Sequence, residues 1–214
     1  MASVETAAVT APYADYMIAS QSVEYAEGWD YGFLKGLESD ADGAETGARI
    51  IDAVFAAGSG KSGKKSYQAM SCVKLDEIRH VEACMDELFI KAAGLIDQGT
   101  FSGFEKGRGF AYDSEKMKIA EDIDLVDLAS LCGALAGDDP DGAARTREAV
   151  EKAVVCKRSD DGLCCGLMVY HPYKNLHEFE SRWRDVYTRL KFCPGYTAYI
   201  VVFSRFMLGD APEI

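Results

Sequence analysis

The alternation of short apolar segments with longer helical segments constrains the fold of this chain most strongly. Residues 15–20 (DYMIAS) are short, apolar and flanked by turn residues, which predicts a strand. Residues 66–73 predict a second strand, and residues 43–57 predict a helix between the two. Residues 74–96 place apolar side chains at three- and four-residue steps, which predicts the longest helix. Strands separated by helices indicate an α/β layered fold.

The rest of the chain continues this alternation. Residues 2–11 predict a helix with Ser3 as its N-cap. Asp124 is expected to cap a helix whose leucines recur at three- and four-residue steps. Trp29, Phe33 and Leu37 at four-residue spacing predict one helical face. Further strands are expected at 153–158 and 166–171, and further helices at 143–152, 176–190 and 195–208.

The charge balance excludes two classes of partner. The net charge is −12, from 35 acidic and 23 basic residues. Non-specific nucleic-acid binding needs a basic face, and an anionic membrane repels an acidic surface. No apolar run reaches the roughly 18 residues that span a bilayer. We therefore expect no nucleic-acid or membrane partner, whereas a cationic partner or substrate would be attracted.

The seven cysteines do not resemble a disulfide framework, because their number is odd and no pair has C-x-x-C spacing. Most have apolar neighbours and are expected to be small buried hydrophobes, which fits a reducing environment. A nucleophilic cysteine needs a histidine as general base. The chain has three histidines, and nothing in the sequence places one against a particular cysteine.

Three short motifs suggest ligands, and each departs from its pattern. GSGKS at 58–62 resembles a phosphate loop, but Phe55 takes the place of the first glycine. A phosphate loop also follows a strand and precedes a helix, whereas here a helix is expected before the loop and a strand after it. Residues 38–49 resemble half a calcium loop, but Arg49 occupies the position of the bidentate glutamate. His80 and Cys84 supply only two metal ligands. We expect no cofactor and no metal site.

Four stretches taken together resemble the clostripain family, which are caspase-like cysteine endopeptidases. YADYMIASQ followed by GWDYGFLKGL is similar to the family's strand after the nucleophile and its substrate-pocket segment. IDLVDLASL is similar to a helix start in the family's second half, and GLMVYHPYKN to its closing strand. The order and spacing match along nearly all of the chain.

This resemblance implies a three-layer caspase-like α/β sandwich that lacks its first strands. Residues 1–98 would be the C-terminal part of the peptidase domain, and residues 99–214 a helical C-terminal subdomain packed on it. In the family the nucleophile lies in a D-A-C-L segment, and Met1 matches the position two residues after that cysteine. The general-base histidine lies further upstream. The chain alone would therefore be inactive, with the N-terminal half of the domain as its partner.

The missing strands would leave strand 15–20 with an unpaired edge, so we expect the chain alone to be poorly soluble or to pair with itself or a partner. Three origins stay open: a gene start assigned at an internal Met, a split gene, or a decayed remnant. The first residues do not resemble a signal peptide. Family members are often exported, and the location of this chain stays open.

The resemblance also implies a substrate: a peptide or protein cleaved after Arg or Lys, whose side chain enters an acidic pocket. Asp30 is the candidate pocket acid, because a carboxylate binds a guanidinium bidentately. A helix N-cap is the alternative role for Asp30. Calcium dependence is known in the family, but no ligand set stands out here. The other candidates are Trp29 as an apolar wall, Ser20 and Gln21 at the strand end, and Glu24 and Glu27 at the rim.

Two other functions are compatible with the sequence. The first is a non-catalytic module that binds basic peptides through the same acidic pocket. The second is a nucleotide-binding protein, which would require Lys61 of the loop at 58–62 to contact a phosphate. Arg-peptide binding by the chain alone would favour the first, and ATP binding lost on changing Lys61 would favour the second.

Overall fold

The structure is a computed structural model, and no helix in its described part is long and apolar enough to cross a membrane. It describes residues 1–22, 28–29, 31–37, 41–57, 67–97 and 124–209.

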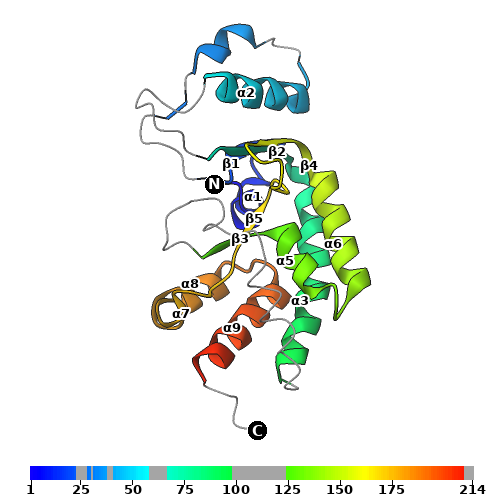
Figure 1. Cartoon of the computed structure of the whole chain (residues 1–214), viewed down its shortest axis with the longest axis vertical. Coiled ribbons are helices and arrows are strands. Elements are labelled where there is room, and N and C mark those ends of the chain that lie inside the picture. The colour runs from blue at the N-terminus through cyan, green and yellow to red at the C-terminus, as the bar shows by residue number, and fades with distance from the viewer. Residues whose placement is uncertain (23–27, 30, 38–40, 58–66, 98–123, 210–214) are drawn as a thin grey trace.

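A three-stranded antiparallel sheet lies in the upper part of Figure 1, with helices on both of its sides. Its strands are β1 (Tyr16–Ser20), β2 (Ala69–Lys74) and β4 (Val154–Ser159), with β2 in the middle. Tyr16 pairs with Lys74, so the C-terminal end of β1 lies beside the start of β2. The strands predicted at 15–20, 66–73 and 153–158 are confirmed.

Helix α2 (Gly43–Ala57) covers one face of this sheet. Its buried Ile50, Ile51 and Val54 pack with Met70 and Cys72 of β2. The helix has the bounds that the sequence predicts.

The segment that precedes α2 differs from its prediction. Only Tyr31–Gly36 is helical, as a 3₁₀ turn. Trp29 and Leu37 lie outside it, so the three predicted residues do not form one α-helical face. Trp29, Phe33 and Leu37 nevertheless pack against the α2 cluster, because burial alone brings them together.

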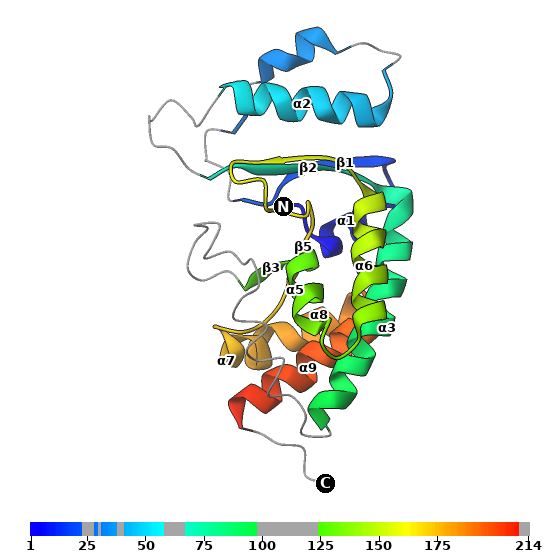
Figure 2. The same ribbon diagram turned by 45° about the vertical axis from the view of Figure 1, so that its right-hand side comes forward.

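α1 (Val4–Thr10), α3 (Ile78–Asp97) and α6 (Pro140–Ala153) lie on the opposite side of the sheet, and α3 and α6 run away from it (Figure 2). A 3₁₀ turn at Leu75–Glu77 leads from β2 into α3. Helix, sheet and helices form three layers, which confirms the α/β sandwich that the sequence predicts.

A second, two-stranded sheet corrects one prediction. Residues Leu125–Asp127 form β3, which pairs with β5 (Met168–Tyr170), and the helix α5 begins only at Leu128 and ends at Leu135. The cap of α5 is Asp127, whose carboxylate accepts the N–H groups of Ser130 and Cys165. Asp124 instead accepts the N–H groups of Lys174 and Asn175. Strand pairing therefore overrides the helical spacing of the leucines.

The C-terminal helices pack on α3. The helix predicted at 176–190 is divided into α7 (Leu176–Glu178), a π-helix (Phe179–Trp183) and α8 (Arg184–Arg189). Helix α9 (Pro194–Leu208) follows, close to its predicted bounds. Its Tyr196 and Tyr199 rings contact Phe89 of α3 at centroid distances of 4.6 and 5.0 Å.

These packing contacts cross the boundary predicted at residues 98/99. β4 pairs with β2, and the largest core cluster contains residues from both segments, including Met85 and Phe203. The division into two subdomains stays a prediction.

Replacing Phe89 with alanine is expected to destabilise the fold by about 3–5 kcal/mol, because the fully buried ring fills the space between α3 and α9. Ile90, on the same helix but 53% exposed, is the matched control. Ile90→Ala is expected to change the free energy of unfolding by less than about 0.5 kcal/mol. Urea unfolding followed by circular dichroism measures both, and similar losses would contradict this packing.

Candidate functional site

The predicted strand residues Ser20 and Gln21 lie at the C-terminal end of β1. The Ser20 hydroxyl lies 3.0 Å from the Ala69 carbonyl oxygen and accepts a hydrogen bond of 3.0 Å from the Ser22 N–H. The Gln21 N–H donates to the Ala69 carbonyl at 2.8 Å. These bonds fix the chain where β1 ends, and Ser20 and Ser22 are buried with it.

The Gln21 side chain is fully buried, and neither its Oε1 nor its Nε2 has a hydrogen-bond partner in the part of the chain that the structure describes. An unpaired buried amide costs roughly 1–3 kcal/mol, so native structures rarely retain one without a reason. In the extended alternation of β1, Gln21 lies on the same face of the sheet as Met17, away from α2. Gln21 therefore carries an unused donor and acceptor at the strand end.

Residues 1–3 contact the C-terminal end of β1. The Ala2 N–H donates to the Ser20 carbonyl at 2.7 Å, and the Ala2 carbonyl accepts the Met168 N–H at 2.9 Å. Ser3 and Met168 also form a parallel bridge. Residues 1–3 thus lie between the ends of β1 and β5, directly beside Ser20.

The outer edge of β1 has no strand beside it among the described residues. The Gln21 N–H bonds to Ala69 and the Leu75 N–H bonds to Asp15, which fixes the phase of the β1–β2 ladder. Backbone groups alternate in direction along an antiparallel strand, so those of Tyr16 and Ile18 point away from β2. They are available to pair with another chain segment.

The two edges of the sheet differ in charge. β1 carries no charged residue between Tyr16 and Ser20, whereas the other edge strand, β4, carries Lys157 and Arg158. Charged side chains on an edge strand disfavour pairing with further strands. The β1 edge is the one suited to receive a partner strand.

Trp29 is half-buried in the cluster around α2. The other candidates of this segment, Asp30, Glu24 and Glu27, lie outside the described residues. Their roles stay predictions from the resemblance.

Sequence reasoning missed an acidic loop at the same end of the sheet. Ala69 pairs with Ser159, which places Asp160 and Asp161 after the end of β4. The Asp160 carboxylate accepts the Gln68 N–H at 2.9 Å, and the Asp161 carboxylate accepts the Tyr67 hydroxyl at 2.7 Å. The turn sequence SDDG was the available signal, but only strand pairing shows where the loop lies.

The thiols of the described chain lack the features of an activated nucleophile. Six cysteines are buried and Cys156 is half-buried, which confirms their predicted role as small hydrophobes. Burial raises the pKa of Cys72 to about 12 and that of Cys164 to about 11. His171 is buried and its Nε2 lies 2.9 Å from the Tyr199 hydroxyl. At neutral pH such cysteines are thiols, and the thiolate is the nucleophile.

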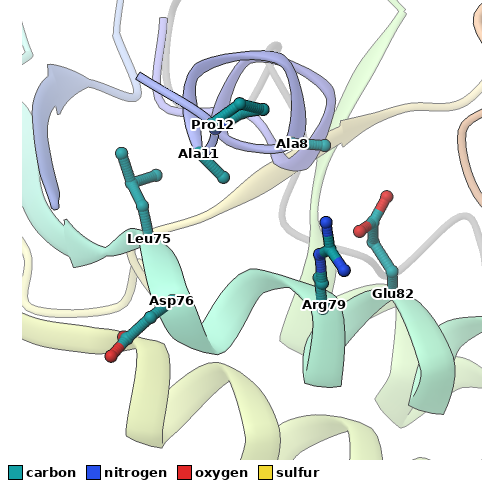
Figure 3. A pocket seen from close by; sticks show the side chains of 7 residues that line it. All are labelled: Ala8, Ala11, Pro12, Leu75, Asp76, Arg79 and Glu82. Atoms are coloured by element: carbon teal, nitrogen blue, oxygen red, sulfur yellow. The ribbon is translucent and has the colours of Figure 1, made fainter. Parts of the chain in front are cut away.

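Two cavities open at the far end of β1. One, of about 250 Å³, lies between α1 and the start of α3 and is lined by Ala8, Ala11, Pro12, Leu75, Asp76, Arg79 and Glu82 (Figure 3). Its neighbour, of about 300 Å³, shares Ala11 and Asp76 and reaches Tyr16. Because Tyr16 begins β1 and Ser20 ends it, neither cavity belongs to the predicted substrate site.

The described residues contain no group of three side chains suited to hold a metal ion. The segment 58–62 that resembles a phosphate loop, and the acids Glu38 and Asp40 of the calcium-like segment, lie outside the described residues.

Comparison with solved structures shows the same fold in bacterial cysteine peptidases. A clostripain from Bacteroides thetaiotaomicron, crystallised with a peptide inhibitor, aligns with 93% of this chain and 82% of its own, at 17% identity and a TM-score of 0.59. An inactive zymogen C11 protease from Parabacteroides distasonis aligns with 86% of this chain at 19% identity and a TM-score of 0.63.

A secreted C11 cysteine protease from B. thetaiotaomicron aligns with 93% of this chain at 18% identity and a TM-score of 0.62. The chain spans only about half the length of this protease and of the zymogen, 53% and 54% respectively. No curated protein sequence matched the chain significantly.

The family model decides the assignment. The model of the clostripain family, Peptidase_C11, matches residues 1–164, which is more than half of the 214-residue chain. The matched range contains β1, the strand end at Ser20 and Gln21, and the sheet that positions them. This chain belongs to the clostripain family of cysteine peptidases.

Proposed function

We propose that this chain carries the substrate-binding part of a clostripain-type cysteine endopeptidase that cleaves after Arg or Lys. The catalytic cysteine and histidine would come from a segment that pairs with the outer edge of β1. The observation that carries the proposal is the hydrogen bond from the Ala2 N–H to the Ser20 carbonyl. It brings residues 1–3 to the strand end where Ser20 and Gln21 lie.

The position of Ala2 matters because the resemblance places the nucleophile two residues before Met1. A cysteine at that place would lie close to the end of β1, beside Gln21. The unpaired Gln21 amide then has a role as donor or acceptor for the catalytic segment or for the substrate backbone. This role would account for a polar group that is costly without a partner.

The described cysteines support a division of labour between this chain and the catalytic segment. Acyl transfer by cysteine needs a thiolate, an imidazole that activates it and donors for the oxyanion. Burial raises the pKa of the described thiols and so disfavours their thiolate forms. The chain alone is therefore expected to bind substrate without cleaving it.

The proposed preference for Arg or Lys rests on the acidic residues of the segment from Glu24 to Asp30. Asp30 would bind the guanidinium or ammonium group, with Trp29 as an apolar wall and Glu24 at the rim. The B. thetaiotaomicron clostripain was crystallised with an inhibitor of sequence VLTK, which ends in lysine. Asp160 and Asp161 add negative charge at the same end of the sheet. A cationic side chain would be attracted to this end.

A non-catalytic module for basic peptides is the second candidate. This module would bind peptides through the same proposed acidic pocket at the end of β1. It differs from the first candidate because no catalytic segment would join it. Binding alone does not separate the two functions, whereas cleavage after addition of a catalytic segment does.

Peptide binding by the chain alone is expected to discriminate charge. A Trp183→Phe variant leaves Trp29 as the only tryptophan, so its fluorescence reports on the proposed pocket. A peptide ending in arginine is expected to bind at least about tenfold more tightly than the same peptide ending in citrulline. The neutral side chain loses the charge-assisted hydrogen bonds, and tenfold corresponds to about 1.4 kcal/mol.

The converse variant, Trp29→Phe, keeps the exposed Trp183 and is expected to give no fluorescence change. Equal affinity for the two peptides, or a response from Trp183 alone, would overturn the acidic pocket near Trp29.

A further inference from the structure

Two cysteines lie opposite each other on adjacent strands of the three-stranded sheet. Cys72 of β2 and Cys156 of β4 are direct register partners. Both belong to the cluster on the α2 side of the sheet, so their side chains share one face. These two cysteines differ from the others in being aligned by the backbone of adjacent strands.

The Cα spacing of this pair lies within the range that disulfides span. The Asp160 N–H donates to the Gln68 carbonyl, which fixes the phase of the β2–β4 ladder and makes Cys72 and Cys156 a hydrogen-bonded pair. The Cα atoms of such a pair lie about 5.5 Å apart. Disulfides span Cα distances of about 4.4–6.8 Å. A register shift lies directly after Cys72, between Cys72 and Val73.

We propose that Cys72 and Cys156 form an intramolecular disulfide when the protein meets a small disulfide oxidant such as oxidised glutathione. The Cys156 thiolate would attack the oxidant first, because Cys156 is half-buried whereas Cys72 is fully buried. This step forms a mixed disulfide and releases one glutathione thiolate. The Cys72 sulfur then attacks the Cys156 sulfur and releases the second. The two protein thiols lose two protons and two electrons, and the oxidant becomes two glutathione molecules.

The reaction is expected to accelerate with pH. Burial raises the pKa of Cys72 to about 12, and it also raises the pKa of Cys156. The attacking species is the thiolate, so its fraction increases about tenfold per pH unit below the pKa of the attacking thiol. Between pH 7 and pH 9 the oxidation rate should increase by about two orders of magnitude.

The bond would form under helix α2. The Cys72 Sγ lies 4.0 Å from the Gly43 carbonyl oxygen, and a Cβ added at Gly47 would lie 2.4 Å from that sulfur. Gly47 therefore leaves room for the Cys72 side chain between α2 and the sheet. A disulfide here would fix β4 to β2 beneath the cluster that also contains Trp29. The inference does not depend on the proposed peptidase function.

Trypsin provides a direct test. Its peptides 66–74 and 153–157 each contain one cysteine, Cys72 and Cys156 respectively. The purified chain is incubated with oxidised glutathione at pH 8, remaining thiols are alkylated, and the digest is analysed by mass spectrometry. The expected product is peptide 66–74 linked to peptide 153–157, and reduction separates them. Unlinked peptides, stable mixed disulfides with glutathione, or linkage to another cysteine would overturn the proposal.

A second measurement does not rely on peptide mapping. The oxidised chain should melt several degrees above the reduced chain, because the crosslink restricts the unfolded state. Cys156→Ser should abolish this difference, while Cys84→Ser on α3 should preserve it. Equal melting temperatures in the parent, or a difference that survives Cys156→Ser, would contradict the bond.

Discussion

Replacing Ile18 with proline is expected to weaken association between this chain and the proposed catalytic segment, and with it cleavage after arginine. The Ile18 N–H points away from β2, so proline removes a donor from the outer edge but leaves the β1–β2 ladder in place. Proline removes the hydrogen bond that the Ile18 N–H would donate to the incoming strand, and an acceptor left without its donor costs about 1–3 kcal/mol, which corresponds to about 5- to 150-fold weaker association. Titration of the two segments, followed by peptidase activity, measures the loss.

Lys157→Pro is the matched control on the opposite edge. The Lys157 N–H lies on the outer edge of β4, and no strand pairs with that edge among the described residues. This variant should associate and cleave like the parent. Equal losses in both variants would show a general effect on folding. Unchanged association of Ile18→Pro would remove the β1 edge from the account.

Changing Asp30 to alanine is expected to lower kcat/KM for arginine substrates by about a hundredfold in the assembled peptidase. The change removes a carboxylate proposed to bind the guanidinium through charge-assisted hydrogen bonds, whose loss costs about 1.5–3 kcal/mol. Substrates with a neutral residue in place of arginine should be affected much less. Steady-state kinetics with paired arginine and citrulline peptides measures this difference.

Asp160→Asn is the control for charge alone, because Asp160 is an exposed acid at the end of the sheet where Ser20 and Gln21 lie, and an asparagine oxygen can still accept the Gln68 N–H. Loss of the Asp160 charge should change kcat/KM by less than about threefold, as expected for a screened surface charge. Parent-like kinetics of Asp30→Ala would remove Asp30 from the pocket. Similar effects of both variants would replace a specific pocket with a diffuse acidic surface.

The local sequence pattern was sufficient to predict elements whose buried residues recur at a regular helical or strand spacing. Helix α2 has the predicted bounds because its apolar residues follow the helical repeat and pack on a single sheet face. The prediction of a helix at residues 125–127 was wrong, because the leucine spacing there also fits a helix. Their pairing with β5, more than 40 residues later, decided the outcome. The break of the helix at Phe179–Trp183 into a π-helix has no signal that spacing detects.

The candidate site was predictable only in part, for the same reason. Ser20 and Gln21 were placed at a strand end because β1 is short and bounded by turn residues. The contacts of Ala2 with Ser20 and Met168, and the position of Asp160, depend on how distant strands pair. Neither follows from residue type. The orphaned Gln21 amide is likewise visible only once the fold encloses it.

The coding sequence on the 5′ side of the Met1 codon distinguishes a peptidase from a protein that only binds peptides. The proposed function predicts that this sequence, or a neighbouring reading frame, encodes an Asp-Ala-Cys-Leu segment and an upstream histidine. Together with this chain, that segment should cleave peptides after arginine. Absence of any such coding sequence, with a chain that stays a soluble monomer, would contradict the peptidase account and leave the peptide-binding function in its place.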